Sequence, residues 1–226
     1  MTRKDFKDRM KNVFLWMPIA LYAIDPSFEN GGQEWSWKSG DSGWHSYTVS
    51  SERAHTGRHS AKVSLESRPF TGRAQIWGAV QSYDVSEIPR KLGVWYRIEN
   101  WEQAVEKQYV QIVVMIHDER LKKLTTQPQM QIRYLLAGVS KPPYPDPVNG
   151  RYLLVGSKTP KQGRWIHFET DPVQDFIKAW GWFPSNFKKM EIFLEVRYDE
   201  PLPEGASISG DVYWDDLTVS TTPSKD

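Results

Sequence analysis

Apolar and polar residues alternate with a period of two along most of the chain after residue 24. Segments rich in β-branched and aromatic side chains recur between Gly, Pro, Asn and Ser residues, and this pattern predicts β-strands. The predicted strands are Trp44–Val49, Ser60–Glu66, Ala74–Ser82, Leu92–Ile98, Tyr109–His117, Gln131–Ala137, Tyr152–Gly156, Trp165–Thr170, Lys189–Tyr198 and Asp211–Ser220. A chain with this many short strands is expected to be an all-β protein.

The predicted strands have two unlike sides. In Leu92–Ile98 the apolar residues share one side, whereas Trp95 and Arg97 occupy the other. The segment Glu191–Tyr198 alternates in the same way, with Glu195 among its outward residues. One apolar side and one polar or aromatic side on each strand is what a two-sheet sandwich needs. About ten strands with long connections predict a two-sheet antiparallel jelly-roll sandwich.

Little helix is expected in this fold. Asp171 and Pro172 offer a cap and a first helical residue, and apolar residues then follow at helical spacing, which predicts one short helix near 172–181. Residues 140–151 contain four prolines and are expected to form an extended, exposed loop.

The first 18 residues form a charged and then apolar segment with two interpretations. The first is a short helix followed by a buried strand at Ile19–Ile24. The second is an export signal, because basic residues precede the short apolar run Val13–Ile24. That run is too short to span a bilayer, which takes about twenty residues. The simplest division of the remainder is one domain at 19–220 and a tail at 221–226.

Composition narrows the classes of function. The 226 residues include 29 Lys and Arg against 28 Asp and Glu, and this near-neutral balance argues against nucleic-acid binding. Cysteine is absent, which excludes disulfides, thiolate catalysis and Cys-ligated metal centres. The chain has 11 Trp, 10 Tyr and 9 Phe, so we expect some rings to lie at a surface rather than in the core.

Three motifs, in order along the chain, resemble one known family. They are Ile24–Gly31, with the letters IDPSFENG, Ala54–Val63, with AHTGRHSAKV, and Gly210–Val219, with GDVYWDDLTV. Together they are similar to the galactose-binding-like jelly-roll domains that include many carbohydrate-binding modules. The resemblance implies the jelly-roll fold, glycan binding without catalysis, and an extracellular, cell-surface or periplasmic location. The middle of the chain matches no subgroup of that family.

The resemblance also implies a structural calcium ion. In that family an opening Glu, carbonyl groups of the hairpin and an Asp of the closing strand commonly hold this ion. The matching positions are Glu29, the backbone around Arg58 and Ser60, and Asp215. Carboxylates and carbonyls suit calcium, which takes about six to eight oxygen ligands.

Charge burial supports this assignment and also leaves an alternative. Asp215 shares the sequence parity of Leu217, and a carboxylate facing a core is costly unless it is paired or metal-bound. The alternative is that Asp215 or Asp216 pairs with Arg58 or Lys62 and that no metal binds.

A sugar-binding face needs flat aromatic rings beside planar hydrogen-bonding groups, because sugars present apolar C–H faces and hydroxyls. The outward positions of the predicted strands that supply such groups are Trp77, Trp95, Arg97, Gln111, Arg133, Glu195 and Arg197. The loops add Trp35, Trp37, Trp44 and Tyr144. The alternative for any single Trp is packing in the core or at its rim.

Two further functions compete with glycan binding. Paired carboxylates such as Glu191 and Glu195 are used in glycoside hydrolysis, and Tyr109, His117 and Arg133 fit a polysaccharide lyase. The chain lacks the compact Gln-Ile-His grouping of such lyases, so we expect no catalysis. The stronger rival is a structural or assembly subunit of an extracellular or cell-surface complex, which would use the same faces for self-association or for binding a neighbouring protein.

Overall fold

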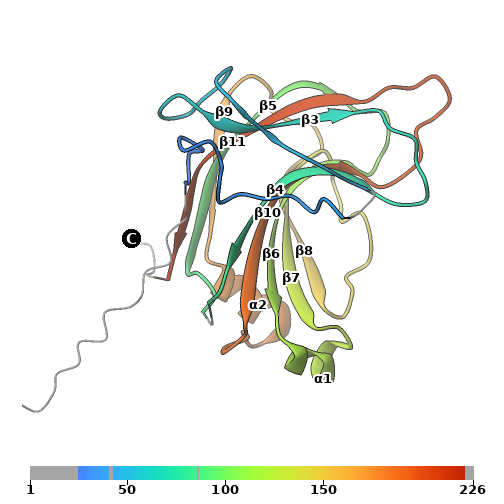
Figure 1. The fold of residues 1–226 in the computed structure, drawn as a ribbon. Helices are drawn as coiled ribbons and strands as arrows, with labels where there is room; N and C mark the ends of the chain where they lie inside the picture. Colours follow the sequence, from blue (N-terminus) through green and yellow to red (C-terminus); the bar gives the residue numbers. More distant parts are fainter. Residues whose placement is uncertain (1–24, 41–42, 86, 222–226) are drawn as a thin grey trace, which may run out of the picture.

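The computed structural model describes residues 25–40, 43–85 and 87–221. Two β-sheets pack face to face in this part of the chain (Figure 1). The N-terminal segment, the predicted strand at 19–24 and nearly all of the predicted tail lie outside the described residues. No helix among the described residues is long and apolar enough to cross a membrane.

The first sheet has six strands in the order β1-β4-β10-β6-β7-β8. Its strands are β1 (Trp44–His45), β4 (Gln75–Tyr83), β6 (Gln108–His117), β7 (Gln129–Ala137), β8 (Gly150–Ser157) and β10 (Lys189–Tyr198). Neighbours are antiparallel except for the pairs β1–β4 and β7–β8, which are parallel.

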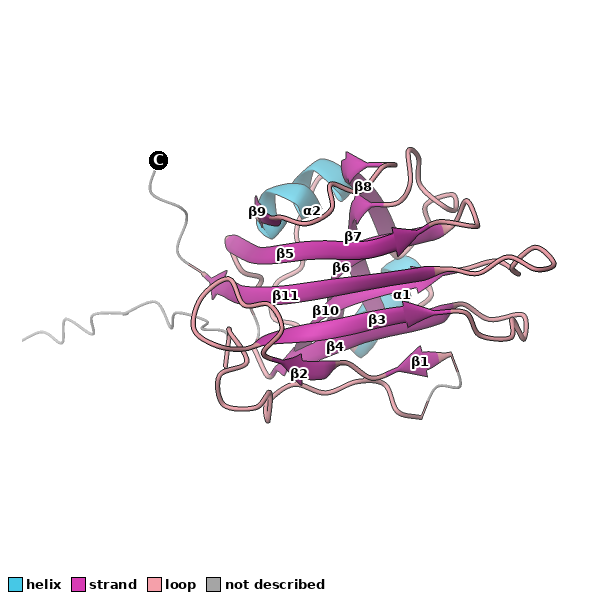
Figure 2. Cartoon of the chain, turned by 90° about the horizontal axis from the view of Figure 1, so that it is seen from above, coloured by secondary structure: helices cyan, strands magenta, loops and turns pink. Residues whose placement is uncertain are grey.

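The second sheet has five strands in the order β2-β3-β11-β5-β9, and all its pairs are antiparallel. Its strands are β2 (Thr48–Ser50), β3 (Ser60–Glu66), β5 (Lys91–Glu102), β9 (Trp165–Thr170) and β11 (Ser209–Ser220). Seen from above, this sheet lies over the six-stranded one (Figure 2). The predicted all-β jelly-roll sandwich is confirmed.

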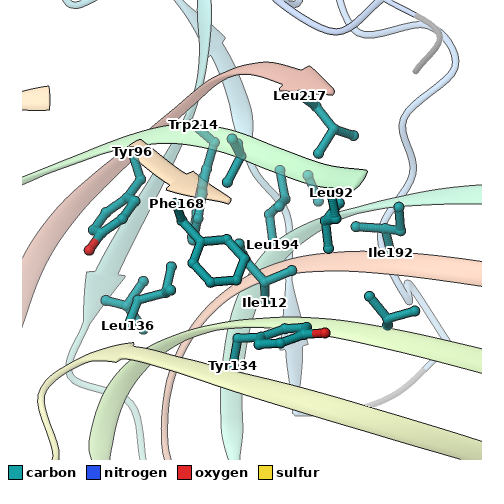
Figure 3. Packing of buried hydrophobic residues seen from close by; sticks show 14 of the residues in the cluster. Leu92, Tyr96, Ile112, Tyr134, Leu136, Phe168, Ile192, Leu194, Trp214 and Leu217 are labelled. Atoms are coloured by element: carbon teal, nitrogen blue, oxygen red, sulfur yellow. The ribbon is translucent and has the colours of Figure 1, made fainter. Parts of the chain in front are cut away.

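One hydrophobic core fills the space between the sheets (Figure 3). Leu92, Tyr96 and Trp214 of the five-stranded sheet face Ile112 and Leu194 of the six-stranded sheet, and all are nearly excluded from solvent. The inward residues of β10 join this core, as its alternating pattern predicts, and they are Ile192, Leu194, Val196 and Tyr198.

The helices are short and lie outside the sheets. Helix α2 (Pro172–Trp180) begins at Asp171, whose side chain accepts a hydrogen bond from the Gln174 amide, and ends at Gly181 with φ 78°. This confirms the predicted helix. A 3₁₀ turn, η1 (Glu119–Leu121), and α1 (Lys122–Thr125) were not predicted, because neither is long enough to show a helical period.

The predicted strand Trp44–Val49 is wrong as one element. Its first residues form β1 in the six-stranded sheet and its last form β2 in the five-stranded sheet. The chain crosses from one layer to the other at Ser46 and Tyr47, and the Tyr47 ring packs against the core. A period of two cannot reveal such a crossing, because both halves continue the same alternation.

The expectation that Trp77 faces outward is also wrong. Its side chain is 4% exposed, belongs to the core with Ala79, and stacks on His45 at 4.3 Å between ring centroids. Strand β4 is apolar on both sides, since Val80 on the opposite side is fully buried too. Alternation therefore could not decide which side of β4 meets the other sheet.

Truncation of one inward residue of β10 should test the core. Leu194→Ala is expected to lower the free energy of unfolding by about 2–5 kcal/mol, because it leaves a cavity between the sheets. Leu124→Ala is the matched control, since Leu124 is 63% exposed and should change stability by less than about 0.5 kcal/mol. Equal effects in urea unfolding would contradict this placement of the core.

Candidate functional site

Four residues predicted to contact a ligand lie together on the side of the six-stranded sheet that faces away from the core, here called the outer face. They are Gln111, Arg133, Glu195 and Arg197, and they come from β6, β7 and β10. The register of these strands sets Glu195 directly beside Gln111. The outward residues of these three strands therefore form one continuous surface.

At one end of the outer face the polar groups bind each other. The Gln111 side-chain amide donates to Glu195 Oε2 at 2.6 Å, and Arg197 lies 3.5 Å from the same oxygen. Arg197 also donates to Asp199, which accepts a second bond from the Tyr109 hydroxyl at 2.7 Å. We call these five residues the ion-pair cluster.

Glu195 is nearly excluded from solvent, and burial raises its pKa although Arg197 and Gln111 oppose the shift. Arg133 lies beside the ion-pair cluster and packs over the Tyr152 ring, with 4.9 Å from its guanidinium to the ring centroid. Gln111 Oε1 is buried and has no hydrogen-bond partner among the described residues. Most of the polar groups at this end of the outer face therefore bind one another.

At the other end the outer face is hollowed. A hollow of about 750 Å³ is lined by Trp37, Lys38, Ser39, Gly40, Trp44, Arg73, Met115, His117, Glu191 and Phe193. Trp44 packs on Phe193 with 5.9 Å between ring centroids, and Trp37 is 37% exposed. The hollow therefore combines aromatic walls with charged side chains, a combination that suits a polar ligand.

A buried carboxylate forms the polar base of the hollow. Glu191 accepts hydrogen bonds from Lys38 at 2.7 Å, Lys189 at 2.9 Å, His117 at 2.8 Å and Ser82 at 3.2 Å. Burial opposes ionisation of Glu191, but the bonds from His117 and the two lysines hold its pKa well below the usual range. Glu191 therefore stays charged and fixes the cations around it.

Sequence reasoning found this hollow only in part. Trp37 and Trp44 were expected to offer rings from loops, and the alternation of β10 places Glu191 on the same side as Glu195. Nothing in the sequence joins Lys38 to Glu191, because the two residues are far apart along the chain. Trp35, also expected to offer a ring, instead packs in the core against Phe28 at 4.7 Å.

Trp95 and Arg97 lie on the opposite side of the molecule from the outer face, on the outward side of the five-stranded sheet. The Trp95 ring stacks with His55 at 3.9 Å and with His167 at 4.8 Å between centroids. Arg97 is bound to Glu99. The structure therefore does not bring these two residues together with the other predicted ligand contacts.

The residues expected to hold calcium meet at one loop. Glu29 Oε1 accepts hydrogen bonds from the amides of Arg58 and His59, both at 2.8 Å. Asp215 Oδ2 accepts from the amides of His55 at 2.6 Å and Thr56 at 3.2 Å. The two carboxylates thus hold residues 55–59 from two sides, and we call this arrangement the loop clamp.

Asp215 reaches the loop clamp by a route that parity did not predict. The register of β11 pairs Asp215 with the outward Trp95, and a bulge then follows in which Asp216 has φ 50°. The extra residue returns Leu217 to the core, so Asp215 does not share the inward side of Leu217 as expected. Asp215 is nonetheless fully buried beneath the loop, and this burial raises its pKa to about 6.

The loop clamp closes through backbone amides, which donate hydrogen bonds to the two carboxylates. The Ser60 hydroxyl donates to the Arg53 carbonyl, and Lys62 pairs with Glu52 and not with Asp215. Among the described residues no group of three or more His, Asp or Glu side chains is placed to hold a metal ion. Calcium at this position stays a prediction.

No protein-family model and no curated protein sequence matches the chain. Similar solved structures include a family 61 carbohydrate-binding module in complex with β-1,4-galactotriose, with 13% identity and TM-score 0.42 over 88% of this chain and 96% of that one. A family 28 module specific for non-crystalline cellulose shows 16% identity and TM-score 0.45 over 87% and 93%. The tandem family 22 modules of Xyn10C from Paenibacillus barcinonensis show 14% and 0.47 over 90% and 50%. All three of these solved structures are of carbohydrate-binding modules.

The charge of Glu191 should make stability depend on pH in the acid range. Its folded-state pKa lies below the ordinary value of 4.5, so its contribution is present above that pH and is lost as the pH falls. Glu191→Gln should therefore be less stable than the wild type at pH 7, and the difference should shrink as urea unfolding is repeated below pH 4.5.

Glu66→Gln is the control for this measurement, because the Glu66 side chain is 56% exposed on the other sheet. Its stability difference from the wild type should stay small across the same pH range. A Glu191→Gln difference that does not change with pH would contradict the charged state assigned to Glu191.

Proposed function

We propose that the protein is a non-catalytic carbohydrate-binding module that binds a glycan in the hollow of its outer face. The observation that carries this proposal is the pair of indoles, Trp37 and Trp44, standing at the wall of an open hollow beside charged side chains. We further propose that the protein acts outside the cytoplasm, at the cell surface or in the extracellular or periplasmic space.

The chemistry of the hollow suits a sugar ring. The C–H face of a pyranose packs on an aromatic ring. The hydroxyls around the edge of the sugar need hydrogen-bonding side chains next to that aromatic ring. Phe193 and Met115 extend the apolar surface inward from Trp44. Lys38 and His117 stand close enough to this surface to share a bound sugar with it.

The ion-pair cluster would continue the site along the outer face. Gln111, Arg133, Glu195 and Arg197 stay proposed ligand residues, either as direct contacts or as groups that hold the face in shape. Trp95 and Arg97 stay predictions for the separate five-stranded face, whereas the buried Trp77 is no longer proposed. Affinity per site should be low, because a shallow sugar site buries little area. Tethering or multivalency would then supply the overall avidity for the glycan.

Truncation of one indole of the hollow should weaken glycan binding strongly and leave the fold intact. Trp37→Ala is expected to weaken glycan binding at least tenfold in affinity electrophoresis on soluble polysaccharides, because it removes an aromatic wall of the hollow. Trp182→Ala is the matched control, since Trp182 is equally exposed at 37% but lies just after α2 and does not line the hollow.

Indifference of the wild type to every glycan tested would contradict the proposal. In that case light scattering at several concentrations would test the rival function as an assembly subunit. Self-association has one observation in its favour, since Leu154 and Val155 are 44% and 49% exposed on the edge strand β8. Equal weakening of binding by both Trp variants would contradict the placement of the site.

Calcium is proposed as a structural ion at the loop clamp, and the sugar site does not depend on it. If it binds only the folded protein through Glu29, Asp215 and carbonyl oxygens near Arg58 and Ser60, thorough chelation should lower the Tm by about 5 °C or more. Magnesium at the same concentration is the control cation. A Tm that changes neither on chelation nor on addition of calcium would contradict calcium binding. The amide hydrogen bonds alone would then hold the loop clamp.

A further inference from the structure

The charged groups of the hollow are unequally exposed. The side chains of Lys38 and Lys189 are 40% and 41% exposed and that of His117 is 32% exposed, whereas the Glu191 side chain that binds all three is 3% exposed. A ligand in the hollow therefore meets the cations first. Their carboxylate counter-charge lies beneath them, out of its reach.

Glu191 has little capacity left for a ligand. One of its oxygens accepts from Lys38, Lys189 and Ser82, and the other accepts from His117. A carboxylate offers only about four acceptor positions. Among the described residues that line the hollow, sugar hydroxyls would thus find no carboxylate with spare capacity to accept from them.

The two lysines, in contrast, can still donate. Each ammonium carries three N–H groups and gives one to Glu191. Because Glu191 fixes their positions, the remaining donors are already oriented before a ligand arrives. Binding of an anion therefore costs little additional side-chain entropy of the two lysines.

The charges around Glu191 do not cancel. Among the described residues, two ammonium groups, those of Lys38 and Lys189, bind the one carboxylate of Glu191, so this group of three carries a net positive charge.

On the basis of the function proposed above, we propose that the hollow selects glycans that carry an anionic group, a carboxylate or a sulfate. The sugar ring packs on Trp37 and Trp44, and the anionic group sits against the ammonium groups of Lys38 and Lys189. A neutral glycan can use the same indoles but offers those ammonium groups no second anion beside Glu191. Such charge-assisted bonds are about twice as strong as neutral ones.

The test compares matched polymers. The probes are polygalacturonate and the same polymer after carboxyl reduction, and a sulfated galactan and its desulfated form, each titrated into the wild-type protein by calorimetry. We expect at least one anionic member to bind tenfold or more tighter than its neutral counterpart. Its affinity should also fall at least threefold between about 50 and 200 mM NaCl, because salt screens exposed charges.

Variants identify the groups responsible. Lys38→Gln and Lys189→Gln should each reduce affinity for the anionic polymer by a larger factor than affinity for its neutral counterpart, whereas Lys38→Arg should keep the preference because the charge remains. Lys91→Gln makes the same charge change on the five-stranded sheet, where Lys91 binds Glu169, and should change neither. Melting temperatures of all variants would report any loss of fold.

The outcomes separate this inference from the proposed function. If neutral and anionic partners bind equally and Trp37→Ala abolishes both, the hollow binds glycans and the preference for an anion is overturned. If no polymer binds, the proposed function fails and the inference fails with it. Preference confined to the carboxylated or to the sulfated member supports the inference and identifies the anionic group.

Discussion

The alternation of side chains along β10 is the constraint on which both the fold and the site depend. Its inward residues, including Leu194, build the centre of the core, and its outward residues Glu191, Phe193, Glu195 and Arg197 run along the outer face. A slip of one residue in register would place carboxylates between the sheets and leucine in water. Burial of the core therefore fixes the positions of the charged groups without any contribution from a ligand.

The two glutamates of this strand share a side but have opposite electrostatic environments. Hydrogen bonds from His117 and two lysines hold the pKa of Glu191 low, whereas Glu195, with one amide and a more distant guanidinium, has a raised pKa because it is buried. Their Cα atoms are four residues apart on one strand, about 13 Å. Each carboxylate is bound by partners of its own, Glu191 by His117 and two lysines and Glu195 by Gln111.

The sequence was most informative where one side of a strand is clearly polar. The outward side of strand β10 could be predicted, because charged residues alternate with apolar ones along it. Helix α2 could be predicted because Asp171 caps it. Strand β4 carries apolar residues on both sides, so the inward position of Trp77 could not be read from it. The position of Asp215 depends on a bulge at Asp216, which no period of two contains.

The hollow itself could not be predicted, because it depends on contacts between distant segments. Lys38 and Trp44 come from the chain before β2, and Glu191 comes from β10, which pairs with β4 and β6. The loop clamp is similar in kind, since residues 55–59 meet Glu29 from one end of the described chain and Asp215 from the other. Motif order indicated that these ends approach one another, but not that amides would join them.

The central claim, that a glycan occupies the hollow of the outer face, is tested most directly by nuclear magnetic resonance of the indole N–H groups. The chain has 11 Trp residues distributed over both sheets and the core. On titration with a polysaccharide that binds, the resonances of Trp37 and Trp44 should shift, and those of Trp95 and Trp214 should not. Shifts of Trp95 with unchanged Trp37 and Trp44 would place the ligand on the five-stranded sheet and contradict the account.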